Sequence, residues 1–100
     1  MTWEFEGVVF EWSGDAAWHF VRLPVEVAEE IRDALVEPPR GFGSLKVEAR
    51  IGATEWSTSI FPDGESFVLP LKKAVRHAEG VLADDVVQVE LAVRAAGERD

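Results

Sequence analysis

The sequence contains no cysteine, which excludes disulfide bonds, thiolate zinc sites and thiol nucleophiles. It also lacks any apolar run of about 18 residues, the length that suggests a membrane-spanning helix. Glu4, Glu6 and Glu11 interrupt the start of the chain, where a secretory signal needs a basic residue and an unbroken apolar segment. We therefore expect a cytoplasmic protein without membrane attachment.

Positive charge is scarce, with 10 lysines and arginines against 19 aspartates and glutamates, and the formal net charge is -9. A charge of this sign favours solubility and weakens long-range attraction to nucleic acids and anionic lipids. Nucleic acid is therefore an unfavoured partner, although a local basic patch can still bind it.

Hydrophobic residues make up 47% of the 100 positions and include four tryptophans and six phenylalanines. A chain of this length buries about two thirds of the surface that its unfolded state exposes. This is enough for one compact core and too little for two. We expect a single domain over residues 1–95 and a frayed tail over residues 96–100.

Period-two alternation of apolar residues predicts a mainly β protein. The clearest example is LKVEARI, residues 45–51, with one apolar and one charged face. The expected strands cover residues 3–12, 17–23, 45–51, 56–60, 67–71 and 87–93. Within the first strand the alternation changes phase near Gly7, because Trp3 and Phe5 share one face whereas Val8 and Phe10 share the other. A glycine at such a point predicts a bulge or a bend, as expected where a sheet curls into a barrel.

Two short helices are expected, each following a Leu-Pro pair at the end of a strand. The first begins at Pro24 and ends before Pro38, because proline starts a helix well and cannot continue one. The second covers about residues 71–79, with Gly80 as its C-cap. Its predicted apolar face consists of Leu71, Ala74, Val75 and Ala78.

An internal repeat links these two helices. FVRLPVEVAEEI (20–31) and SFVLPLKKAVRH (66–77) both run from a strand through Leu-Pro into a helix, offset by 46 residues. The repeat suggests pseudo-twofold symmetry. Glutamates start the first helix, whereas Lys72 and Lys73 start the second and oppose the partial positive charge of a helix N-terminus.

The basic cluster Lys72, Lys73, Arg76 and His77 is the main candidate site. Its lysines and the free backbone donors of the helix start can converge on a small anionic ligand, a phosphate or a carboxylate. The alternative, which we favour, is a solvated helix face paired with carboxylates from elsewhere in the chain. Trp56 is a further candidate contact, because it either fills a barrel or lines a ligand cavity.

Other constellations give weaker signals. His19 and His77 are too isolated for a metal site, and His19 is expected to be structural or exposed. Ser57 or Ser59 with His77 and Asp63 lacks the spacing of a hydrolytic triad. The acidic residues of the first helix lack the loop of a calcium site. We therefore expect no metal, no cofactor and no catalytic residue.

Three stretches carry a resemblance to a known family: DAAWHFVRLPVEVAEEI, RGFGSLKVEARIGATEWSTSIFP, and FVLPLKKAVRHAEG followed by VVQVEL. Over nearly its whole length the chain resembles DUF1905, a family of small bacterial and archaeal proteins of undetermined function. The resemblance implies a small closed antiparallel β-barrel of the double-split type, related in shape to AbrB-like regulators. With the patterns above, we expect six to seven strands and two short α-helices.

The chain departs from this family at Asp84-Asp85, where the family usually has Gly-Asp before the last strand. If the first position needs a positive φ, Asp84 tolerates it better than most residues, so the turn is expected to survive. For function, we expect a non-enzymatic binding or interaction module with a small anionic ligand or a protein as partner. The alternatives are an AbrB-like DNA-associated regulator, and a small-ligand-binding barrel or unrecognised enzyme.

Overall fold

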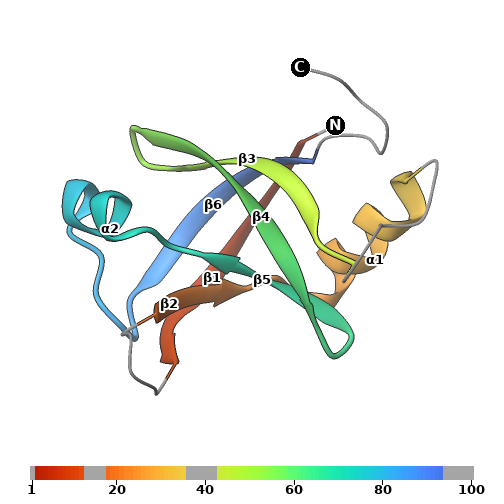
Figure 1. Ribbon diagram of the computed structural model, residues 1–100, viewed down its shortest axis with the longest axis horizontal. Helices are drawn as coiled ribbons and strands as arrows, with labels where there is room; N and C mark the ends of the chain where they lie inside the picture. Colours follow the sequence, from red (N-terminus) through yellow and green to blue (C-terminus); the bar gives the residue numbers. More distant parts are fainter. Residues whose placement is uncertain (1, 13–17, 36–42, 94–100) are drawn as a thin grey trace.

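A computed structural model describes residues 2–12, 18–35 and 43–93 of the chain. Its elements are β1 (Thr2–Trp12), β2 (Trp18–Arg22), α1 (Val25–Ala34), β3 (Leu45–Ile51), β4 (Thr54–Asp63), β5 (Ser66–Pro70), α2 (Lys73–Glu79) and β6 (Val86–Val93). The strands close into an antiparallel barrel in the order β1-β2-β5-β4-β3-β6, and β6 pairs with β1 (Figure 1). The expected small closed β-barrel with two short helices is confirmed. The first helix, expected to run up to Pro38, ends at Ala34, because Leu35 is already extended (φ -73°, ψ 133°) as its C-cap. The predicted turn at residues 13–15 and the frayed tail lie outside the described residues.

The barrel consists of two β-β-α-β halves that interlock. β1, β2, α1 and β3 form one half, and β4, β5, α2 and β6 form the other; exchanging them preserves the cyclic order of the strands. Across the local axis β2 pairs with β5, with Val21 opposite Leu69, and β3 pairs with β6, with Ala49 opposite Leu91. The pseudo-twofold symmetry suggested by the sequence is present in the topology.

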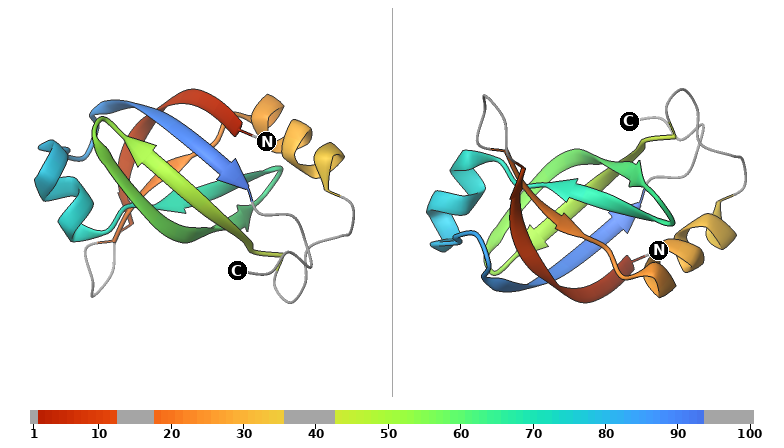
Figure 2. Two further views of the ribbon diagram at one scale, coloured as in Figure 1. Left: turned by 90° about the horizontal axis from the view of Figure 1, so that it is seen from above. Right: turned by 90° about the horizontal axis from the view of Figure 1, so that it is seen from below.

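The two helices cover opposite ends of the barrel (Figure 2). This follows from the antiparallel pairing of β2 with β5, which points their two Leu-Pro ends in opposite directions. Backbone hydrogen bonds extend the pairing into both junctions: Leu23 N–H donates to Phe67 O, and Leu71 N–H donates to His19 O, each at 2.9 Å. Among the described residues, neither helix has the length and apolar character needed to cross a bilayer.

The interior of the barrel is a single hydrophobic core. Inward residues of all six strands and the inner faces of both helices contribute to it; the most deeply buried large side chains are Leu23, Ile31, Ile60, Leu69, Leu91, Val9, Val21, Val47 and Val89. Trp56 is only 9% exposed and belongs to this core, as expected for a residue that fills the barrel.

Of the bulge or bend predicted at Gly7, the bulge is wrong, whereas β1 does change its partner from β6 to β2 between Val8 and Val9. Pairing of β1 with β6 runs without interruption through Gly7, which lies opposite Val87. Val8 does face away from Phe5, but that face is the outside of the barrel, and Val8 is 52% exposed. The face that carries the apolar residues therefore changes, whereas the pairing of β1 with β6 continues without a bulge. Gly7 instead permits a close approach, because a Cβ at this position would lie 2.5 Å from Cγ1 of Val21.

The turn before β6 keeps the conformation expected of it. Asp84 has a φ of 74°, so an aspartate occupies the left-handed region that glycine usually takes. Backbone hydrogen bonds join this turn to β1: Asp84 N–H donates to Val9 O at 2.7 Å, and Val9 N–H donates to Asp85 O at 2.8 Å. The Asp85 side chain accepts a hydrogen bond from Leu82 N–H at 2.8 Å.

The close packing at Gly7 gives a stability prediction. Gly7→Ala is expected to lower the free energy of unfolding by about 1–3 kcal/mol, the usual cost of overpacking, because the new methyl group overlaps Val21. Urea unfolding followed by tryptophan fluorescence measures this loss. In Gly7→Ala/Val21→Ala the overlapping carbon is removed, so the loss should be smaller than the sum of the two single losses. Unchanged stability of Gly7→Ala would contradict the packing described.

Candidate functional site

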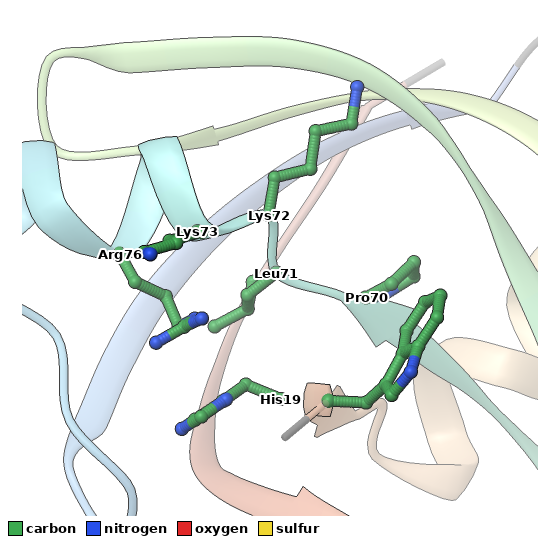
Figure 3. A pocket seen from close by; sticks show the side chains of 7 residues that line it. His19, Pro70, Leu71, Lys72, Lys73 and Arg76 are labelled. Atoms are coloured by element: carbon green, nitrogen blue, oxygen red, sulfur yellow. The ribbon is translucent and has the colours of Figure 1, made fainter. Parts of the chain in front are cut away.

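A pocket of about 240 Å³ opens where β2 meets the junction between β5 and α2 (Figure 3). Trp18, Pro70 and Leu71 form an apolar wall, and the basic groups belong to His19, Lys72, Lys73 and Arg76. The structure thus brings three residues of the predicted basic cluster together with two residues of β2 that are about 50 positions away in the sequence.

α2 turns Arg76 toward the barrel. The helix begins at Lys73, two residues later than expected, because the Leu71 N–H is already bonded to β2. Leu71 therefore belongs to the strand pattern, and the inner face of the helix consists of buried Val75 with half-buried Arg76 and Glu79. The other two members of the predicted apolar face, Ala74 and Ala78, are exposed.

The Nε atom of Arg76 is buried and has no hydrogen-bond partner among the described residues. Leaving a buried donor unsatisfied costs about 1–3 kcal/mol, and more when the group is charged. The alternative favoured from the sequence is a solvated helix face paired with carboxylates. Lys72, Lys73 and His77 are exposed, as that alternative expects. The pairing is not observed, because within the described part of the chain neither Lys73 nor Arg76 forms an ion pair.

Other arginines in the described segments have partners. Arg22 lies 2.6 Å from Asp63 Oδ2, and the Arg32 guanidinium lies 5.0 Å from the centre of the Phe67 ring. Arg50 donates to Glu90 at 2.8 Å, and this hydrogen bond together with the negative charge of Glu90 raises the pKa of Arg50 above its ordinary value. The Arg50 pair is exposed on the outer face of the barrel, where it stabilises little. Arg76 therefore differs from all three.

The two lysines diverge. Lys72 is the N-cap residue of α2 with an extended backbone, and its Nζ donates to the backbone carbonyl of Ser57 at 3.3 Å. Its side chain extends away from His19 and Arg76 (Figure 3). Among the described lysines and arginines that line the pocket, this leaves Lys73 and Arg76 as its sources of positive charge. Arg76 lies in the last turn of α2, where the helix dipole favours a cation.

His19 is the pocket residue whose part was missed from the sequence. It is 8% exposed, and its Nε2 lies 3.5 Å from Oε2 of Glu11. The sequence does carry a signal for this position, the period-two spacing of His19, Val21 and Leu23. His19 and Val21 share the inward side of β2, and Leu23 continues this buried row. Its burial fits the structural role expected of it and excludes the exposed one.

The other candidates lie away from the pocket. His77 is exposed on α2, and Trp56 does not line the pocket, although its Nε1 is buried without a partner among the described residues. Ser57 donates to Glu48 at 2.6 Å and Asp63 pairs with Arg22, so among the described residues the observed partners of these two side chains do not include His77. In the described ranges no three His, Asp or Glu side chains are grouped to hold a metal ion.

Glu79 anchors the far end of α2. Thr54 Oγ1 donates to Glu79 Oε2 at 2.5 Å in a partly buried setting. Gly52, with a φ of 59°, lies against the same carboxylate, and a Cβ there would overlap it. Gly80 ends the helix with a φ of 63°, which confirms the predicted C-cap. These contacts fix the helix that carries Arg76.

Comparison with known families assigns no chemistry to this pocket. The DUF1905 family model, described as a domain of unknown function, matches residues 5–91. The match extends from β1 into β6 and includes every residue that lines the pocket. No curated protein matches the chain.

The Thr54–Glu79 contact predicts how α2 is held. Thr54→Val should lower the free energy of unfolding by about 1–3 kcal/mol, because a partly buried carboxylate loses its donor. Amide hydrogen exchange in α2 should accelerate. Thr58→Val is the matched control, since Thr58 lies on the same strand and makes no side-chain hydrogen bond within the described residues. Exchange in α2 that is equally fast in both variants would show that Glu79 does not anchor the helix.

Proposed function

This chain belongs to the DUF1905 family, whose description assigns no activity, and we propose that it is a small binding module that holds an anion in the pocket between β2 and α2. The buried, unpartnered Nε of Arg76 carries this proposal. A guanidinium presents a planar set of donors that matches the oxygens of a carboxylate or phosphate. An anion bound there would satisfy the donor that no carboxylate of the described residues satisfies.

Charge and size support the same ligand class. Lys73 adds a second positive charge beside Arg76, in a chain whose net charge is -9. The pocket volume of about 240 Å³ lies below the roughly 300–1,000 Å³ typical of sites for drug-sized molecules. The ligand is therefore of the size of a phosphate or a small organic acid.

Binding is better supported than turnover. The described residues that line the pocket have no hydroxyl, thiol or carboxylate side chain to act as a nucleophile or as a carboxylate base. An AbrB-like DNA-associated role is less well supported, because the Lys72 side chain extends away from Arg76 and the remaining two cations neutralise few phosphates.

Titration with inorganic phosphate at low ionic strength tests the proposal, with binding measured by calorimetry. Arg76→Gln should weaken phosphate binding by about tenfold or more, because a charged hydrogen bond contributes about 1.5–3 kcal/mol. Lys72→Gln is the control, because it also removes one positive charge, at the N-cap of the same helix. The Nζ of Lys72 donates to Ser57 O and not toward Arg76, so this variant should change the affinity by no more than about twofold. Absence of phosphate binding to the natural protein, or equal losses in both variants, would refute a site at Arg76.

A further inference from the structure

Two outward tryptophans share one level of the barrel. Trp12 on β1 and Trp18 on β2 are register partners, and they are 56% and 55% exposed. Both rings contact Phe20: Trp18 stacks at 6.3 Å with 12° between the ring planes, and Trp12 meets the same ring edge-on at 6.0 Å and 67°. Phe10 supports Phe20 from the neighbouring strand at 5.8 Å.

Only one of these tryptophans lines the pocket. Trp18 lies in its wall, whereas Trp12 does not. Stacking on Phe20 fixes the plane of the Trp18 ring, so its surface is oriented before any ligand arrives. An exposed indole held in this way provides a platform on which a flat ring can stack.

The pocket therefore combines two kinds of surface. Arg76 and Lys73 provide positive charge, and the wall of Trp18, Pro70 and Leu71 is apolar. An inorganic anion would contact the first surface and leave the second in water. A ligand with an acid group and an apolar ring would contact both, and the volume of about 240 Å³ limits the apolar part to roughly one ring.

We infer that the ligand is a single-ring aromatic anion whose carboxylate or phosphate binds Arg76 and Lys73 and whose ring stacks on Trp18. The inference rests on the proposed anion site and adds the chemical class of the ligand. Stacking on an aromatic side chain is tolerant of ring identity, so the class is defined by planarity, size and charge rather than by substituents.

Phenyl phosphate and inorganic phosphate form the matched pair of probes. The natural protein should bind phenyl phosphate about tenfold more tightly than phosphate, the gain expected from one stacked ring. Trp18→Ala should abolish this preference, whereas Trp18→Phe should retain part of it. Trp12→Ala is the control, since it removes an equally exposed indole from the partner position and should keep the preference.

The outcomes separate this inference from the proposed function. Equal affinity for the two probes would overturn the aromatic ligand and leave the anion site intact. Equal loss of the preference in Trp12→Ala and Trp18→Ala would also overturn it, because the ring would then bind the outer aromatic surface and not the pocket. Failure of both probes to bind would overturn the anion site itself. Circular dichroism confirms that each variant is folded before its affinity is compared.

Discussion

Antiparallel pairing between β2 and β5 runs from Arg22 opposite Val68 to Phe20 opposite Pro70, and the hydrogen bond from Leu71 to His19 extends it by one step. The remaining architecture depends on this contact. It directs the two Leu-Pro ends, and therefore the two helices, to opposite ends of the barrel. It also keeps Leu71 in extended conformation, so that α2 begins at Lys73 and turns Arg76 inward beside β2.

The two halves share a topology, but the polar contacts around their helices differ. α1 buries apolar Ala28 and Ile31, and Trp3, which lies opposite Leu91, donates its Nε1 to Glu30 of this helix at 3.1 Å. Trp56 is the symmetry-related tryptophan of the other half and lies opposite Ala49. Its Nε1 has no partner among the described residues. At the α2 end the Nε of Arg76 also lacks a partner among the described residues. Local departures from polar satisfaction are expected at functional sites, and here they occur where the repeat is broken.

Much of the fold is encoded in local pattern. LKVEARI alternates cleanly because one face is buried, and Gly80 and Asp84 stand where a positive φ is needed. Period-two counting around Gly7 separates two faces of the strand without saying which one is inside, so a change of apolar face does not require a bulge. Leu71 fits both a strand and a helical stripe, and a hydrogen bond to a residue 52 positions earlier decides between them. The pocket joins β2 to α2 across a similar separation in the sequence. The sequence therefore predicted the cations at α2 but not that Trp18 and His19 of β2 lie beside them.

The proposed anion site depends on the Nε of Arg76, which is buried and has no hydrogen-bond partner among the described residues. The ¹H–¹⁵N resonance of this Nε–H group, assigned by its loss in Arg76→Lys, reports on this directly. The account predicts a signal that exchanges with water more slowly than the Nε–H of exposed Arg50 and that shifts when phosphate is added. A signal that exchanges as fast as that of Arg50, or that does not move with phosphate, would contradict it.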